Sequence, residues 1–249
     1  MTTLGTLYGV GAGPGASDLL TLRAVRVLES ADVLALPRGS DFGASMAWQI
    51  IEPVVGKRAS QERLRLTFPM SKDPALVRPR VQAAASAIAE RLAIGRSVAF
   101  VTEGDPSLFS TFGYVRGELL LRLPELRVEV VPGVTSICAV ASIGGVPLAD
   151  GHERVAILPA TYGVDDLVET LQAFDTVVLM KLGAEMPNIL AALERTGLTE
   201  RAFFVSKATM AEQRFEPDVR RLRDEHGGCF SMLVVKRRDR SGRLVGEVS

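Results

Sequence analysis

The stretch Val98-Ala-Phe-Val-Thr-Glu-Gly-Asp-Pro-Ser-Leu-Phe-Ser-Thr-Phe-Gly-Tyr114 sets the framework for the rest of the chain. Its apolar start, residues 98–101, predicts a buried strand, and the turn at residues 102–106 ends that strand. A glycine before a carboxylate, followed by proline, lets the backbone approach a ligand closely. Ligands of open α/β sheets bind outside the carboxyl ends of the strands. The turn is therefore either a binding element or an ordinary strand-to-helix connection that Asp105 caps.

The N-terminal segment shows the same order of strand, turn and helix. Residues 4–10 predict a strand, and Gly9-Val-Gly-Ala-Gly-Pro-Gly-Ala16 forms the turn after it. Ser17 is expected to cap the helix that follows, and residues 32–36 predict a second strand. A strand, a helix and a strand in this order indicate a parallel sheet.

The remaining pattern predicts two α/β domains. Residues 63–70 alternate between polar and apolar and predict an edge strand. A further strand at residues 127–131 ends in Pro132-Gly-Val-Thr-Ser136. A second α/β series begins after a boundary near residues 147–152, with strands predicted at 155–158, 176–180, 202–205 and 230–235. We therefore expect domains at residues 1–148 and 149–249.

Composition excludes several classes of protein. Lys plus Arg and Asp plus Glu both number 29, so the formal net charge is zero and nothing points to nucleic acid as a partner. Two cysteines and two histidines are too few for a disulfide framework or a protein-built zinc site. The N-terminus carries no basic region, and glycine and proline interrupt the longest apolar stretch, residues 134–149. We expect a cytoplasmic protein without a membrane span.

The glycine-rich turn after the first strand has a second interpretation. Gly11, Gly13 and Ala16 satisfy the permissive dinucleotide pattern G-x-G-x-x-A. Pro14 removes one backbone N–H that a phosphate cradle needs. No acidic residue follows the second strand, but Arg38 stands there and could accept a 2′-phosphate. An NADP-dependent reductase is therefore one alternative, and a tight turn without phosphate is the other.

Four strand-end turns in a fixed order resemble the tetrapyrrole methylases, which use S-adenosylmethionine. The matching segments are Val10-Gly-Ala-Gly-Pro-Gly15 with Asp18-Leu-Leu-Thr-Leu22, Glu103-Gly-Asp-Pro106, Val131-Pro-Gly-Val-Thr-Ser136 and Val177-Val-Leu-Met180. The resemblance covers nearly the whole chain. It implies two α/β domains of the class III methyltransferase type, with the cofactor in a cleft between them and the tetrapyrrole in a trough of the N-terminal domain. It also implies a homodimer.

The resemblance carries site residues onto this sequence. The implied cofactor-binding residues are Pro14, Glu103, Gly104, Asp105, Leu108, Thr135, Ser136, Met180 and Ala208. The implied trough residues are Gly11, Gly13, Gly15 and Tyr114. Glu103 and Ala208 stand where the family often has glycine. Asp105 is the candidate for a polar catalytic role, and no metal is implied.

Residues 66–70 and 103–114 are most similar to those members of the family that methylate C20 of precorrin-2 to give precorrin-3A in cobalamin biosynthesis. Their counterparts that act on cobalt-factor II carry nearly the same motifs, and another precorrin methyltransferase is a further alternative. Methyl transfer from a sulfonium needs alignment and exclusion of water rather than a metal. Arginines are expected to bind the substrate carboxylates. A tetrapyrrole-binding module without turnover remains a non-enzymatic alternative.

Overall fold

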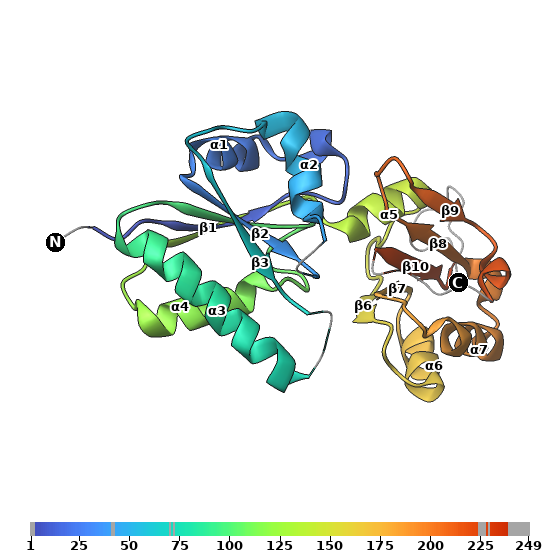
Figure 1. Ribbon diagram of the computed structural model, residues 1–249. Coiled ribbons are helices and arrows are strands. Elements are labelled where there is room, and N and C mark those ends of the chain that lie inside the picture. Colours follow the sequence, from blue (N-terminus) through green and yellow to red (C-terminus); the bar gives the residue numbers. More distant parts are fainter. Residues whose placement is uncertain are drawn as a thin grey trace. The chain divides into compact units, whose positions relative to one another are not determined.

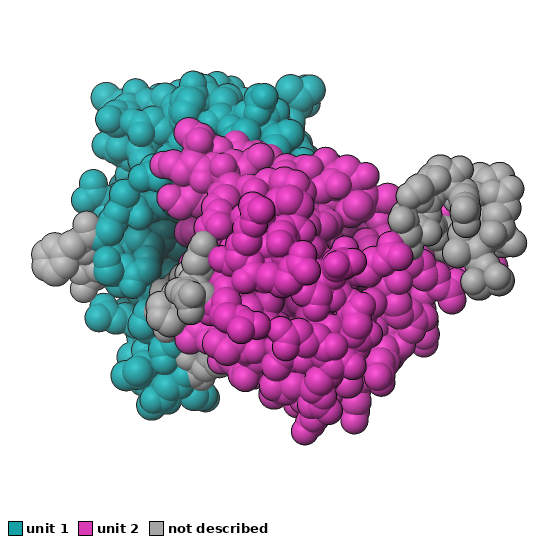
Figure 2. Space-filling model, turned by 90° about the vertical axis from the view of Figure 1, so that its right-hand side faces the viewer, with its two compact units in different colours: residues 1–135 teal, residues 136–249 magenta. Residues whose placement is uncertain are grey.

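Two compact units, Met1–Thr135 and Ser136–Ser249, make up the chain, and Figure 2 shows them in separate colours. The computed structural model describes residues 3–40, 43–69, 71, 73–223, 228 and 230–238. Each unit contains a five-stranded sheet and a hydrophobic core of its own. The expected α/β fold in two parts is therefore confirmed.

The sheet of the first unit is entirely parallel, as its strand-helix-strand order predicts. Its strand order is β3-β2-β4-β1-β5. The strands are β1 (Leu7–Gly11), β2 (Val33–Arg38), β3 (Glu62–Thr67), β4 (Val98–Thr102) and β5 (Val128–Val131). β3 lies at the edge of the sheet, where the alternating sequence placed it.

Helices cover both faces of this sheet (Figure 1). One pair is α1 (Leu22–Ser30) and α2 (Met46–Val55), and the other is α3 (Pro74–Ala93) and α4 (Phe112–Arg122). Side chains alternate between the two faces along each strand. In β2, Val33 and Ala35 pack towards α3 and α4, whereas Leu34 and Leu36 pack towards α1 and α2. Both faces are apolar, which explains the continuous hydrophobic runs of these strands.

Thr21, rather than Ser17, caps the first helix. The Thr21 hydroxyl accepts a hydrogen bond from Ala24 N at 3.1 Å. Ser17 belongs to a short 3-10 turn, η1 (Ser17–Leu19), and its hydroxyl donates to Ile50 O at 2.6 Å. The expected cap was wrong because this extra turn separates the glycine-rich segment from the helix.

The sheet of the second unit is mixed, in the order β6-β7-β10-β8-β9. β10 (Ser231–Lys236) runs antiparallel to both of its neighbours, β7 (Thr176–Met180) and β8 (Ala202–Ser206). The edge strands are β6 (Val155–Pro159) and β9 (Arg214–Glu216). The sequence did not predict β9, since three residues with two charges form no apolar run.

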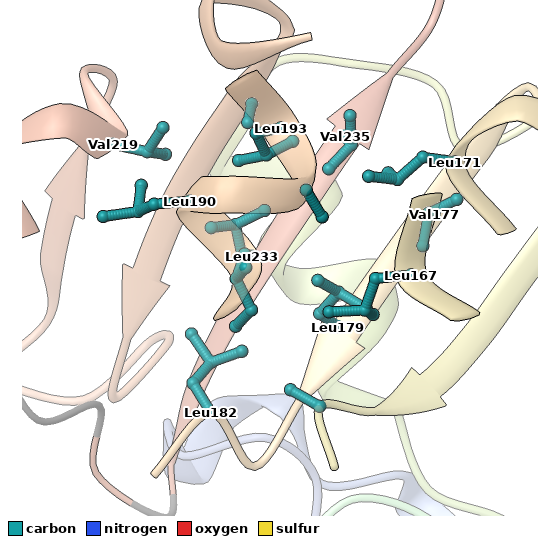
Figure 3. Close-up of a cluster of buried hydrophobic side chains, with 14 of the residues drawn as sticks. Leu167, Leu171, Val177, Leu179, Leu182, Leu190, Leu193, Val219, Leu233 and Val235 are labelled. Atoms are coloured by element: carbon teal, nitrogen blue, oxygen red, sulfur yellow. The ribbon is translucent and has the colours of Figure 1, made fainter. Parts of the chain in front are cut away.

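The core of the second unit lies under two helices, α6 (Val164–Ala173) and α7 (Met186–Thr196). Figure 3 shows Leu167 and Leu171 of α6, Leu190 and Leu193 of α7 and Leu233 of the central strand β10, which belong to one cluster. The short 3-10 segments η2 (Thr199–Arg201) and η3 (Val219–Leu222) complete this unit.

The boundary between the units comes earlier than the expected one at residues 148 and 149. Helix α5 (Ser136–Gly144) begins the second unit and contacts β8 and β10. A Cβ atom on Gly144 would lie 2.3 Å from the ring of Phe203 in β8. The glycine and proline residues after α5 indicated a linker, but the packing of α5 assigns this helix to the second sheet.

Candidate functional site

Three strand-end loops of the first unit join at the carboxyl edge of its sheet. β1 lies between β4 and β5, so the loops that follow these strands are neighbours. Ala12 N donates to Thr102 O at 2.8 Å, and Gly104 N donates to Gly13 O at 2.7 Å. Gly13 N donates back to Gly104 O at 3.3 Å. The loop after β1 is thereby fixed to the loop after β4.

Glycines allow the three loops to come this close. A Cβ atom on Gly11 would lie 2.6 Å from both Gly104 O and Gly133 N. A Cβ atom on Gly133 would lie 2.2 Å from Gly104 O. Backbone atoms cannot give way as a flexible side chain can, so these positions accept only glycine. The contact joins segments that lie more than a hundred residues apart in the sequence.

The carboxylate of Asp105 connects the loops after β4 and β5. Its Oδ2 atom accepts a hydrogen bond from Gly133 N at 2.9 Å. Its Oδ1 atom accepts one from Ser107 N at 2.8 Å and one from the Ser107 hydroxyl. Burial raises the pKa of Asp105, but the hydrogen bonds from Ser107 and Gly133 outweigh it and leave the pKa lowered. Asp105 is therefore ionised, and both of its oxygens position loops.

Glu103 differs from Asp105 in the direction in which its pKa is shifted. Burial raises its pKa, and the opposing hydrogen bonds from its own backbone N–H and from Ala47 N, in the first turn of α2, do not offset the loss of solvation. The hydrogen bond from Ala47 N connects the Glu103 carboxyl to α2. The two carboxyls lie two residues apart and have opposite preferences for a proton.

The rest of the loop after β4 is fixed by hydroxyl groups and one aromatic ring. Ser110 Oγ donates to Thr102 Oγ1 at 3.0 Å and accepts from Phe112 N at 3.1 Å. The ring of Phe112 fills the space beside Gly9, where a Cβ atom would lie 2.4 Å from it. Leu108 N donates to Asp105 O at 3.2 Å. The roles of Ser107 and Ser110 could not be predicted from the sequence, because their partners depend on how the loop folds.

The second unit carries the other predicted cofactor positions. β7 and β8 run in the same direction, since each is antiparallel to β10. Met180 ends β7, and Ala208 follows β8; both are buried. Lys181, Lys207 and Thr209 in the same turns have positive φ angles of 56°, 47° and 65°. Non-glycine residues in this region cost about 1–3 kcal/mol each and gather at functional sites.

The structure brings four of the predicted residues of the first unit together. Gly13 and Gly104 are hydrogen-bonded to each other, Gly11 lies against Gly104 and Gly133, and Asp105 accepts a hydrogen bond from Gly133 N. Pro14 is buried and directly follows Gly13 in the sequence. Thr135 comes two residues after Gly133. Tyr114 differs: it lies in the first turn of α4, is 66% exposed, and has no hydrogen bond to these residues in the part of the chain that the structure describes.

The dinucleotide interpretation of the glycine turn does not fit this geometry. Ala12 N and Gly13 N both donate to carbonyl groups of the loop after β4, and Pro14 has no N–H. A phosphate cradle needs such groups to point at the ligand. The glycines serve packing between loops instead. Within the described residues, no helix is long and apolar enough to cross a membrane, and no cluster of three or more metal-ligating side chains occurs among them.

Comparisons with known proteins agree with the order of these loops. Residues 6–222 match the model of the tetrapyrrole (corrin/porphyrin) methylases. The chain is 35% identical over 236 residues to a cobalt-precorrin-2 C(20)-methyltransferase from Salmonella typhimurium, covering 94% of this chain and 97% of that one. It is 32% identical over 241 residues to a precorrin-2 C(20)-methyltransferase from Sinorhizobium sp, covering 93% and 95%.

A solved structure shares the fold. It is the uroporphyrin-III C-methyl transferase of Thermus thermophilus complexed with S-adenyl homocysteine, with a TM-score of 0.67, 25% identity and coverage of 93% of this chain and 97% of that one. The family match extends from the start of β1 to the end of η3, so it includes all the loops described above. The chain is therefore a member of the tetrapyrrole methylase family.

Proposed function

We propose that this chain transfers a methyl group from S-adenosylmethionine to C20 of precorrin-2 or of its cobalt-containing form, giving precorrin-3A or its cobalt counterpart. The observation that carries the proposal is similarity along almost the full length of two methyltransferases named for that position. One of these names includes cobalt and the other does not, so both substrates belong to the proposal.

The residues at the carboxyl edge of the first sheet suit such a cofactor. Asp105 is an ionised carboxylate, and the loop around it is fixed by hydrogen bonds at both oxygens. A fixed negative charge and backbone carbonyls are the groups that a cationic sulfonium and an ammonium group prefer. When bound, S-adenosylmethionine would supply an activated methyl group: its carbon–sulfur bond breaks as the carbon–carbon bond to C20 forms, S-adenosylhomocysteine is the leaving group, and C20 loses its proton.

The protein contributes position and exclusion of water rather than a strong base. The glycine contacts and the Asp105 network make the three loops rigid before any ligand arrives, and such preorganisation lowers the barrier to displacement. We assign Asp105 to this positioning role. Pro14, Gly104, Leu108 and Thr135 are proposed to contact the cofactor from the same loops, and Gly11, Gly13, Gly15 and Tyr114 to line the trough for the tetrapyrrole.

The cofactor positions of the second unit are proposed from the resemblance and supported by backbone strain. Met180 and Ala208 adjoin Lys181, Lys207 and Thr209, whose positive φ angles mark these turns. Ser136 begins α5. We also propose a homodimer, on the resemblance alone, which sedimentation or light scattering would test.

The decisive experiment follows the methyl group. The chain is incubated without oxygen with S-adenosylmethionine carrying a 13C-labelled methyl group and with precorrin-2, and in parallel with cobalt-precorrin-2. We expect the mass of one substrate to increase by one labelled methyl group, with the 13C signal assigned to C20 by NMR. Transfer to another position would change the assignment within the family, and the absence of transfer to either tetrapyrrole would overturn the proposal.

A further inference from the structure

A group of arginines lies on one face of the β2–β3 edge of the first sheet. Leu64 and Leu66 of β3 pack towards α3 and α4. Side chains alternate along a strand, so Arg63, Arg65 and Thr67 lie on the opposite face, the one that α1 and α2 cover. Arg65 is level with Leu36 in the parallel register, and Leu36 belongs to the core beneath α1 and α2.

Arg38 joins this group at the carboxyl end of β2. It is level with Thr67 in the register, and its Nε atom donates to Thr67 Oγ1 at 3.1 Å. This bond confirms that the two side chains share a face. Arg38, Arg63 and Arg65, together with Thr67, are called the arginine face below.

Two members of the arginine face are already engaged by the fold. The guanidinium of Arg63 lies 4.9 Å from the centre of the Trp48 ring in α2, a cation–π contact. Arg38 is oriented by Thr67. Arg65 is different: its side chain is exposed and forms no hydrogen bond or ion pair with any residue that the structure describes.

The surrounding charges favour an anion at this place. Arg63 and Arg65 are two residues apart on one strand, so their Cα atoms lie about 7 Å apart and their charges repel. The one carboxylate of these two strands, Glu62, stands at the amino end of β3 and binds Arg91 and Arg96. A ligand with carboxylates would relieve this repulsion.

The arginine face also reaches the carboxyl edge of the first sheet, the edge that carries the predicted site residues. β2 pairs with β4 over Val33–Ala35, whereas its pairing with β3 extends to Arg38. Arg38 therefore ends β2 at the same carboxyl edge at which Gly104 and Asp105 follow β4. β3 and β4 are two strand spacings apart, about 10 Å. A tetrapyrrole with several acidic side chains can extend over such a distance while its reacting carbon stays at the loops that follow β1, β4 and β5, called the loop cluster below.

We propose that Arg65, together with Arg38, binds a carboxylate of the tetrapyrrole substrate. This inference rests on the function proposed above and assigns that function to particular residues. Arginine binds a carboxylate through two parallel N–H donors, and the strand fixes the face of the sheet from which each of these side chains extends. Arg63 stays on Trp48 and contributes charge without direct contact. Arg38 and Arg65 set the orientation of the substrate and take no part in bond making.

The test compares Arg65→Gln and Arg65→Lys with a matched control, Arg116→Gln. Arg116 is an exposed arginine of α4, on the opposite face, and likewise has no ion pair with a described residue. Binding of precorrin-2 is measured by absorbance titration with S-adenosylhomocysteine present, and binding of S-adenosylhomocysteine alone by calorimetry. Steady-state KM and kcat and the melting temperature complete the set.

Arg65→Gln is expected to weaken precorrin-2 binding and raise KM about tenfold, the effect of one charge-assisted hydrogen-bonded pair at an accessible site. Its kcat, its affinity for S-adenosylhomocysteine and its melting temperature should stay those of the wild type, because this contact is equal in ground and transition states. Arg65→Lys should recover part of the loss, since the charge remains without the planar fork. Arg116→Gln should match the wild type.

Three outcomes would contradict the inference. Equal precorrin-2 binding by the Arg65→Gln and Arg116→Gln variants, beside a wild type that binds and methylates, would overturn the arginine assignment alone. Loss of S-adenosylhomocysteine binding in Arg65→Gln would assign the residue to the cofactor instead. A wild-type chain that binds neither precorrin-2 nor its cobalt form would overturn the proposed function, and the inference would fall with it.

Discussion

At the scale of single residues, two neighbouring carboxyls show how burial and hydrogen bonds decide a charge. Asp105 accepts hydrogen bonds from Gly133 N and from two donors of Ser107, so it stays ionised in spite of partial burial. Glu103 is dominated by burial, which favours its protonated form. The family resemblance assigned both carboxyls to the cofactor site. Their different partners in the fold could not be predicted, because the direction of each side chain depends on loop contacts that the sequence does not show.

The raised pKa of Glu103 predicts how stability depends on pH. A carboxyl whose pKa is higher in the folded than in the unfolded state stabilises the fold below its unfolded value, near 4.5, and this contribution is lost as pH rises through the folded pKa. Glu103→Gln keeps an oxygen for Ala47 N without the charge. We expect the variant to melt above the wild type at neutral pH, by a margin that shrinks as pH falls towards 4.5.

Thermal melting of both proteins between pH 4.5 and 8 measures this margin. The matched control is Glu125→Gln, at an exposed carboxyl, which should change the melting temperature little at any pH. A margin for Glu103→Gln that is absent at neutral pH, or that grows towards acid pH, would show that the carboxyl is ionised and stabilised in the folded chain.

At the scale of elements, local patterns predicted which segments form helices and strands but not where they pack. The parallel sheet of the first unit followed from alternating strands and helices, and the edge position of β3 followed from its alternation. The antiparallel direction of β10 could not be predicted, because an apolar run reads the same in either direction. The partner of α5 was also hidden: its small residues fit any close contact, and only the structure shows Gly144 against Phe203.

The packing of α5 on β8 predicts an interaction between these two residues. A methyl group on Gly144 would overlap the Phe203 ring, which is itself buried against Phe215 at 5.7 Å between ring centres. Gly144→Ala should therefore destabilise the fold by about 1–3 kcal/mol. Phe203→Leu should also destabilise it, but the double variant should lose less than the sum of the two.

Urea unfolding of the four proteins gives the interaction free energy. Gly117→Ala, inside α4 with open space around its Cβ position, is the control and should be neutral or raise stability by about 0.5–1 kcal/mol. Strict additivity of the Gly144 and Phe203 changes would contradict the contact between α5 and β8.

At the scale of the whole molecule, order along the chain was more informative than any single motif. The glycine turn alone fitted a dinucleotide site as well as a tight turn, and Asp105 alone fitted a helix cap. Four turns in one order pointed to the family, and the structure explains why three of them belong together: strands β4, β1 and β5 are adjacent, so Gly104, Gly11 and Gly133 meet. Sheet order is a property of the folded chain, which is why sequence reasoning named the residues without their contacts.

Because each unit has a hydrophobic core of its own, we expect a substitution in one core to lower the stability of that unit alone. Trp48 is the one tryptophan of the chain and packs against the core of the first unit, so its emission reports unfolding there. Circular dichroism reports both units. Leu233 is fully buried in the core of the second unit, and Leu233→Ala should destabilise that unit by about 2–5 kcal/mol. The urea midpoint by circular dichroism should fall, while the Trp48 midpoint stays near its wild-type value.

Leu28→Ala provides the reciprocal variant, since Leu28 is fully buried in the same core that Trp48 contacts. It should lower the Trp48 midpoint by a change in free energy of similar size, because both substitutions remove the same atoms from a closed apolar core. A Leu233→Ala variant in which both midpoints fall together would show that the two units unfold as one cooperative block. Damage to either core would then reach the loop cluster, and a loss of activity could no longer be assigned to the unit that carries the substitution.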